Sequence, residues 1–313
     1  MADPIAPAGE PDQPPGGLVP RLAAEAASRL VAADLSPGQV AALVRVALAE
    51  DLADGPDVTT EATVPAGARG RADLVSRSSG VVAGLPVADL AFRLVPAGDD
   101  LAVVYRAEDG DRVVPGQAMM TVTGPVSAIL TAERTALNLL SQLSGVASLT
   151  RQFADEVAGT AVVIRDTRKT VPGLRALQKY AVRCGGGVNH RMSLSDAALI
   201  KDNHVAAAGS VAAAFAAVRQ AAPGIPVEVE CDTLEQVTEA IEAGADLILL
   251  DNFTVEEMAA AVRLAAGRAK LEASGRITID SARAIAATGV DYLAVGALTH
   301  SAPVLDIGLD LLE

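Results

Sequence analysis

The basic side chains of this 313-residue chain are concentrated in one short segment. Eight of its 25 lysines and arginines lie between Arg165 and Lys201, where the only acids are Asp166 and Asp196. The chain as a whole has a formal net charge of −14, so this local excess of charge is opposite in sign to the charge of the whole chain. Such a cluster of guanidinium and ammonium groups is typical of a site that binds carboxylates or phosphates.

The positions of these basic residues divide them into two groups. Arg175, Lys179 and Arg183 recur at helical spacing, and we predict that they form a solvated basic face. The others lie at strand ends or in glycine-rich loops, where a ligand is the expected partner of a charge: Arg168, Lys169, His190, Arg191 and Lys201. Guanidinium groups bind carboxylates and phosphates through two parallel hydrogen bonds, and lysine adds a compact charge. The mixture predicts a ligand that carries both groups.

Two acidic residues, Glu230 and Asp251, end apolar runs further along the chain. In an α/β barrel catalytic groups project from the carboxyl ends of the strands, so both residues are candidates for the same site as the cations. Whether Glu272, near another strand end, belongs to the site stays open. His204 and His300 lack the spacing of metal ligands, so we predict no zinc site and expect loop hydrogen bonds instead.

These residues need a fold that brings separate strand ends together. Apolar runs predict strands at residues 162–165, 199–201, 227–230, 247–251, 270–272 and 292–295, with alanine-rich helices between them. Strands that alternate with helices form a parallel sheet. In an α/β barrel the groups at many strand ends point toward one axis, whereas a doubly wound sheet carries a glycine-rich turn after its first strand, and this chain has none there. We therefore predict an α/β barrel.

The N-terminal part has a different pattern. Residues 1–20 contain six prolines and no basic start before an apolar block, which predicts a disordered tail rather than a secretory signal. Helices are expected at residues 21–31 and 39–52, with Ser36 and Pro37 starting the second. Valine-rich runs between residues 72 and 122 predict a small sheet with one helix. Residues 131–157 read as helix, with a break at Gly145 and a domain boundary nearby.

Composition excludes several classes of partner. Half of the residues are hydrophobic but only 2% are aromatic, so Ala, Val, Leu and Ile must fill the core, as in α/β proteins. The acidic charge predicts that neither nucleic acid nor an anionic membrane is bound. Only two cysteines are present, without a second pair of ligands, and no apolar run is long enough to cross a bilayer. We expect a cytoplasmic protein.

The order of the charged motifs resembles that of the quinolinate phosphoribosyltransferases. The blocks that carry the resemblance begin at residue 50 and end at residue 300: Glu50-Asp-Leu, Asp57-Val-Thr-Thr60, Ala132-Glu-Arg-Thr-Ala-Leu-Asn138, Asp166-Thr-Arg-Lys-Thr-Val-Pro-Gly-Leu-Arg175, Lys179-Tyr-Ala-Val-Arg183, Gly185-Gly-Gly-Val-Asn-His-Arg191, Leu199-Ile-Lys-Asp-Asn-His204, Val227-Glu-Val-Glu230, Leu250-Asp-Asn252 and Val295-Gly-Ala-Leu-Thr-His300. The resemblance covers about residues 40 to 308. It implies transfer of a phosphoribosyl group from phosphoribosyl pyrophosphate to quinolinate with decarboxylation, which gives nicotinate mononucleotide in NAD biosynthesis.

The resemblance also implies roles for individual residues. Lys169, Lys201, Glu230 and Asp251 would be catalytic, with no organic cofactor. Glu230 and Asp251 would stabilise the positive charge that develops on the ribose or would hold Mg²⁺, and the sequence does not separate these two roles. The substrates would be bound by these four and by a further set: Arg134, Thr167, Arg168, His190, Arg191, Ser274, Gly275, Arg276, Gly296, Ala297 and His300. Arg134 would reach the pocket of a neighbouring subunit, which implies a homodimer or larger homo-oligomer with shared active sites.

One position departs from the family pattern. The family usually has a second glycine where this chain has Arg276, next to Gly275, in the loop expected to bind the terminal phosphate. An arginine can present its N–H to that phosphate if its backbone angles are ordinary, but not if the position requires a positive φ.

By the same resemblance, residues 21–143 would form an open α/β sandwich domain, with 302–313 packed on it, and residues 144–301 an incomplete TIM-like barrel. Two alternatives remain open for the function. One is a relative with another acceptor, such as a molybdenum-associated homologue or a nicotinate-using enzyme. The other is a non-catalytic sensor of a phosphorylated metabolite, which would gain nothing from carboxylates among its cations.

Overall fold

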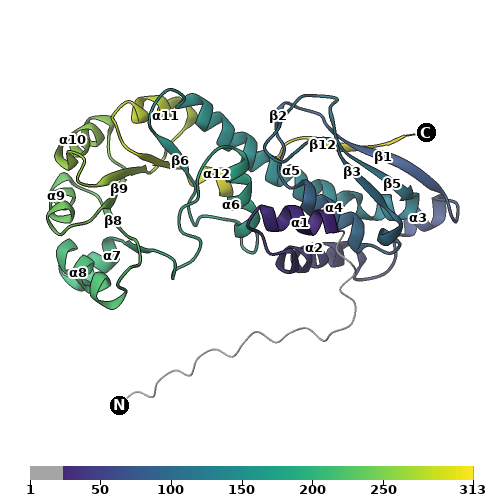
Figure 1. Cartoon of the computed structure of the whole chain (residues 1–313), viewed down its shortest axis with the longest axis horizontal. Helices are drawn as coiled ribbons and strands as arrows, with labels where there is room; N and C mark the ends of the chain where they lie inside the picture. The colour runs from purple at the N-terminus through teal and green to yellow at the C-terminus, as the bar shows by residue number, and fades with distance from the viewer. Residues whose placement is uncertain (1–23, 313) are drawn as a thin grey trace, which may run out of the picture.

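The computed structural model describes residues 24–312. Its two larger sheets lie at opposite ends of an elongated molecule (Figure 1). The predicted tail at residues 1–20 lies outside the described residues. One sheet has six strands in the order β6-β11-β10-β9-β8-β7, and the other has four in the order β12-β1-β5-β3. A third, two-stranded sheet pairs β2 (Gly80–Val81) with β4 (Arg112–Val113).

The six-stranded sheet is the predicted barrel. Its strands are all parallel, and each lies within three residues of its predicted position: β6 (Val163–Arg165), β7 (Ala198–Ile200), β8 (Val227–Cys231), β9 (Leu247–Asp251), β10 (Lys270–Ser274) and β11 (Tyr292–Ala294). Among the described residues β6 and β7 do not pair with each other, so the barrel is incomplete, and the predicted fold is confirmed.

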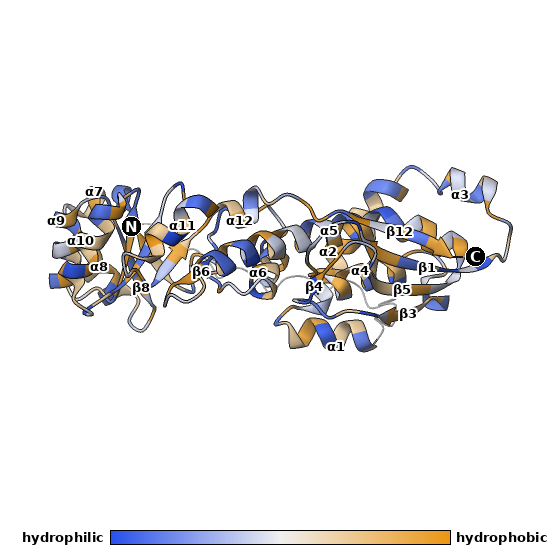
Figure 2. Ribbon diagram, turned by 90° about the horizontal axis from the view of Figure 1, so that it is seen from above, coloured by the Kyte–Doolittle hydropathy of each residue, from blue (hydrophilic) through white to orange (hydrophobic). Residues whose placement is uncertain are grey.

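Helices follow the strands of this sheet along the chain, and most of them lie around it in Figure 1. They are α6 (Arg175–Cys184), α7 (Asp202–Ala208), α8 (Val211–Ala221), α9 (Leu234–Glu242), α10 (Val255–Ala265), α11 (Ile279–Ala286) and α12 (Ala297–His300). Thr233, Thr254 and Thr278 cap three of them by accepting a backbone N–H with the side-chain oxygen. Along these helices blue and orange residues alternate, because only one face packs on the strands (Figure 2).

The four-stranded sheet is antiparallel and joins distant parts of the sequence. It contains β1 (Arg69–Ser76), β3 (Ala102–Tyr105), β5 (Ala118–Pro125) and β12 (Ile307–Leu312). The C-terminal strand β12 lies beside β1, with Leu309 opposite Leu74, as the yellow strand next to the blue one shows in Figure 1. Four helices lie in the same half of the molecule as this sheet (Figure 1): α1 (Ala24–Ala32), α2 (Pro37–Leu52), α3 (Val58–Thr63) and α4 (Leu85–Leu94). Ser36 caps α2 as predicted, since its hydroxyl accepts the N–H of Gln39.

Helix α5 (Val126–Glu156) corrects the expected break at Gly145. The helix is continuous over 31 residues and packs on α4, α6 and the C-terminal strand. Gly145 is present for a different reason: a Cβ atom there would clash with the carbonyl oxygen of Pro303, which crosses the helix at that point. A glycine inside a helix therefore marks a close backbone approach here and not an end.

No single helix within residues 24–312 combines the length and apolar character needed to span a bilayer, although α1 and α2 together, bent by 114°, meet that test by length and composition.

Candidate active site

A pocket of about 350 Å³ opens where the barrel strands end. Nine of the predicted site residues line it together with four others: Thr167, Arg168, Lys169, His190, Arg191, Leu199, Lys201, Glu230, Leu249, Asp251, Glu272, Ser274 and Ala294. Larger hollows exist elsewhere, including one at the amino ends of β8 to β11, but none of those that we find gathers so many cations. Active sites of α/β barrels lie at the carboxyl end of the strands, which is where this pocket is.

Arg168 and Arg191 supply permanent positive charge to the pocket. The Nε atom of Arg168 is buried without a hydrogen-bond partner, and Arg191 donates from Nη1 to the carbonyl of Ala197 at 3.0 Å. Burial lowers the pKa of Arg191, and the neighbouring charge of Arg168 lowers it further. Two like charges held close together in a half-buried place are unfavourable unless an anion joins them. The arrangement is thus built for a negatively charged ligand.

Lys201 and Glu230 form an ion pair inside the pocket, with Lys201 the more exposed partner. Asp251 lies on the next strand and accepts a hydrogen bond from Asn252 Nδ2 at 2.7 Å. Glu230 and Asp251 present only oxygen to the pocket, and oxygen ligands suit Mg²⁺. The ammonium group of Lys201 occupies one oxygen of Glu230, which leaves the other oxygen and the Asp251 carboxylate available to a cation that arrives with phosphates.

His190 lines the pocket, but both nitrogen atoms of its ring bond within the protein. Nδ1 accepts the backbone N–H of Arg191 at 2.6 Å, and Nε2 lies 2.6 Å from Oε2 of Glu228. Because Nδ1 accepts, Nε2 must carry the proton and donate it to Glu228. The carboxylate of Glu228, which sequence reasoning missed, therefore orients the His190 ring.

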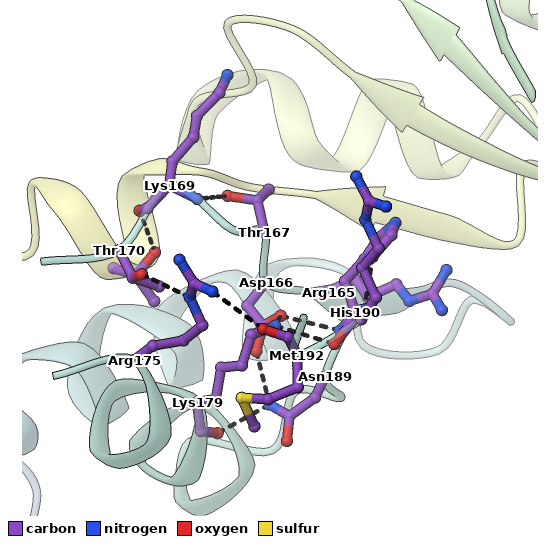
Figure 3. Close-up of polar contacts among 12 residues, drawn as sticks. Arg165, Asp166, Thr167, Lys169, Thr170, Arg175, Lys179, Asn189, His190 and Met192 are labelled. Carbon is purple, nitrogen blue, oxygen red and sulfur yellow. Dashed lines mark hydrogen bonds and ion pairs between the residues drawn. The ribbon is translucent and has the colours of Figure 1, made fainter. Parts of the chain in front are cut away.

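Asp166 holds the loop that carries His190 and Arg191. It is fully buried, and it accepts hydrogen bonds from Lys179, from Asn189 Nδ2 at 2.6 Å and from the backbone N–H of His190 at 2.9 Å (Figure 3). Lys179 also donates to the carbonyl of His190 at 2.9 Å. Burial raises the pKa of Asp166 and lowers that of Lys179, while the attraction between the two opposes both shifts.

Lys179 thus corrects the prediction of a solvated basic face. Its side chain is 0% exposed, because its ammonium group is directed inward to Asp166, just past the end of β6, and to the carbonyl of His190. Its helix neighbours also have partners in the fold: Arg175 donates to Thr170 at 3.0 Å and to the carbonyl of Met192 at 3.1 Å, and Arg183 donates to Asn189 at 2.7 Å. Spacing alone could not distinguish an inward basic stripe from an outward one.

Arg165 and Glu228, which sequence reasoning missed, lie behind the pocket, and Glu272, whose role the sequence left open, lines it. Arg165 Nη1 donates to Oε2 of Glu272 at 2.6 Å, and both carboxyl side chains are nearly or fully buried. A usable signal was present for Glu228, because it stands two residues before Glu230 and strand side chains two apart share a face. The spacing of His190, Glu228 and Glu272 would admit a metal ion, but Arg165 already supplies the positive charge there.

The predicted phosphate loop follows β10. Ser274 lines the pocket, and Gly275 and Arg276, which follow it, have φ values of +96° and +47°. Arg276 therefore adopts the left-handed conformation that suits glycine. The ordinary backbone angles that Arg276 would need to present its N–H to the terminal phosphate are not found. On the neighbouring strand end, a Cβ atom at Gly296 would lie 3.2 Å from Lys169 Cδ and from His300 Nε2, so these residues are adjacent. Ala297 begins α12 beside them.

Arg134 is separate from the pocket of its own chain. Its side chain lies on α5, is 66% exposed and lines another hollow with Glu50, Asp51 and Asp306. The structure therefore brings together most of the predicted residues but leaves Arg134 on an open surface.

Comparison with known proteins identifies the scaffold. Residues 57–144 match the model of the quinolinate phosphoribosyl transferase N-terminal domain, and residues 146–310 match that of the C-terminal domain. The chain belongs to the quinolinate phosphoribosyltransferase family. The two matched domains adjoin inside α5, which the fold carries without interruption.

Individual members of the quinolinate phosphoribosyltransferase family are similar over nearly their whole length. The nicotinate-nucleotide pyrophosphorylase [carboxylating] of Mycobacterium leprae is 55% identical, over 86% of this chain and 95% of that protein. A probable enzyme of the same name from Bacillus subtilis is 43% identical, over 77% and 83%. The structure of the nicotinate-nucleotide pyrophosphorylase from Francisella tularensis superposes with a TM-score of 0.84 at 38% identity, over 88% of this chain and 96% of that one.

Proposed function

We propose that this pocket transfers the phosphoribosyl group of phosphoribosyl pyrophosphate to quinolinate. The pyridine nitrogen attacks the anomeric carbon, pyrophosphate leaves with the bonding electron pair, and the ring then loses one carboxylate as carbon dioxide while a proton takes its place. The product is nicotinate mononucleotide, as in NAD biosynthesis. Support comes from 55% identity to a nicotinate-nucleotide pyrophosphorylase [carboxylating] and from the gathering of paired arginines, lysines and acids in one pocket.

The cations orient the acceptor. Arg168 and Arg191 bind the adjacent carboxylates of quinolinate, and Lys201, held by Glu230, completes this end of the pocket. Fixing the ring in this way places its nitrogen for attack and removes much of the entropic barrier. Lys169 points away from the Asp166 cluster in Figure 3, and we assign its ammonium group to the phosphates. His190 keeps Arg191 in position through the bond to its backbone N–H.

Glu230 and Asp251 face the reacting centre. As pyrophosphate departs, positive charge grows on the ribose ring, and fixed carboxylates lower the energy of that state. The same oxygens would hold Mg²⁺, which neutralises the pyrophosphate when it is bound. Ser274 and the segment around Gly296, Ala297 and His300 bind the terminal phosphate. Gly275 and Arg276 shape the turn that precedes this site.

The proposed reaction is tested by turnover. Purified protein with quinolinate, phosphoribosyl pyrophosphate and Mg²⁺ should give nicotinate mononucleotide, detected by mass, and equal amounts of carbon dioxide and pyrophosphate. Nicotinate should be used at least about 10²-fold less efficiently, because a missing carboxylate leaves a buried cation unpaired. Equal use of nicotinate would point to the alternative acceptor, and no turnover with either acid would contradict the proposal.

The exposed position of Arg134 supports a shared active site in a homodimer. We place Arg134 in the pocket of a partner subunit, where it adds a further cation for the acceptor. The protein would act in the cytoplasm, with no nucleic acid or membrane as partner.

Mixing two inactive variants tests the shared site. Arg134→Ala and Arg168→Ala are each expected to be nearly inactive alone. When they are mixed at equal amounts and allowed to exchange subunits, about a quarter of all sites should become intact, because half of the dimers are mixed and each contains one site without a defect. The activity of the mixture measures this directly. If Arg134 acts within its own chain, mixing restores nothing.

A further inference from the structure

A buried polar cluster lies behind the acceptor end of the pocket. Glu272 is 0% exposed and Glu228 is 3% exposed, and the His190 side chain closes the cluster on the pocket side. Arg165 donates to Oε2 of Glu272, and His190 donates to Oε2 of Glu228. The remaining carboxyl oxygens, Oε1 of each glutamate, are buried and have no hydrogen-bond partner.

The hydrogen-bond donors of this cluster do not satisfy both carboxyl groups if both are ionised. Nδ1 of His190 accepts a backbone N–H, so Nε2 is the ring nitrogen that donates, and it donates to Glu228. Arg165 donates to Glu272 alone. A buried carboxylate oxygen without a donor is unfavourable, and a single proton on one carboxyl group removes part of this cost.

Glu272 is the group that takes the proton. Burial raises its pKa to about 7, the charge of Glu228 adds to this shift, and Arg165 and His190 oppose it. Oε1 of Glu272 lies 3.7 Å from Nε2 of His190. On the neighbouring strands Glu272 is paired with Tyr292 of β11 and with the apolar Leu249 of β9. The ring of Tyr292 lies 4.6 Å from the guanidinium carbon of Arg165.

We propose that Glu272 sets the affinity of the pocket for its dianionic acceptor: the acceptor binds to the form of the enzyme in which the Glu272 carboxyl group is protonated. Glu272 is a positioning residue in this scheme and does not touch the substrate. It acts through His190 and through its own charge. The inference rests on the proposed acceptor, quinolinate, and specifies the protonation state in which the pocket accepts it.

The link to the acceptor is electrostatic. Glu272 lines the same pocket as Arg168, Arg191 and Lys201. A negative charge on Glu272 is poorly screened because the side chain is buried, and it offsets one of the cations that the two carboxylates need. It would also attract the Nε2 proton of His190 away from Glu228 and loosen the bond that orients the ring.

The pH dependence of acceptor binding tests the proposal in the unmodified enzyme. Glu272 is protonated below about pH 7, so the KM for quinolinate should be constant there. Above this pH the enzyme must take up a proton to bind, and the KM should rise by up to about tenfold per pH unit. Calorimetry in buffers of different ionisation enthalpy should detect uptake of up to about one proton per site at pH 8, and little at pH 6.

Glu272→Gln is the matched variant. The amide still accepts from Arg165 but cannot ionise, so the KM for quinolinate should stay near its low-pH value up to pH 8.5 and proton uptake should vanish, with kcat far less affected. Glu256→Gln, an exposed site on α10, should keep the wild-type profile.

Three outcomes would overturn the proposal: a flat wild-type KM between pH 6 and 8.5, an unchanged rise in Glu272→Gln, or no proton uptake. If Glu272→Gln does not fold, the wild-type profile and proton uptake still decide. Turnover of quinolinate without any pH effect on its KM rejects this inference alone, whereas no turnover rejects the proposed function.

Discussion

Replacing Arg168 by alanine is expected to lower kcat/KM for quinolinate by about 10³-fold or more, which corresponds to about 4 kcal/mol. The guanidinium group of Arg168 is partly buried in the pocket, and its Nε has no partner in the protein, so its binding capacity is directed at the ligand. Losing it leaves one acceptor carboxylate without its charge-assisted hydrogen bonds. Steady-state kinetics with quinolinate as the varied substrate measures the effect.

Two companion variants separate charge from geometry. Arg168→Lys keeps the charge but loses the two-pronged contact, so it should recover only part of the activity. Arg219→Ala removes an exposed arginine of α8 and should leave the kinetics unchanged. Thermal unfolding should be similar for all three proteins. If Arg168→Ala retains wild-type kcat/KM, Arg168 is not part of the site.

Replacing Lys179 by methionine is expected to destabilise the protein by about 3–5 kcal/mol. The change leaves the carboxylate of Asp166 in a fully buried place without the ammonium group that neutralises it. Because Asp166 also holds the backbone of His190, the quinolinate KM should rise as well. The free energy of unfolding from urea titration measures the first effect.

The double variant Lys179→Met with Asp166→Asn is the control for this interpretation. It removes both charges while keeping an acceptor for Asn189 and His190, so it should regain much of the lost stability. A double variant that is less stable than Lys179→Met alone would show that the ion pair is not the cause.

The barrel could be predicted because its signal is local. Six apolar runs with polar residues at their ends give strands, and parallel strands bring those ends together without further information. Arg168, Arg191, Lys201, Glu230 and Asp251 therefore reached one pocket as expected.

What could not be predicted depends on packing between distant segments. The inward orientation of Lys179 depends on Asp166 and the carbonyl of His190 lying next to α6, and the role of Gly145 depends on where Pro303 crosses α5. Glu272 is coupled to Arg165, which is 107 residues away in the sequence, and no spacing rule connects them. Arg276 was identified as a departure from the family pattern, but its positive φ required the coordinates.

The uninterrupted α5 limits how the enzyme can open. At 31 residues the helix is about 46 Å long, and it belongs to both lobes, so there is no hinge at which one lobe could rotate against the other. We therefore expect that the two lobes do not close on each other about a hinge. Entry of substrate and release of product would instead depend on the loops at the strand ends, chiefly residues 166–174 and 185–197.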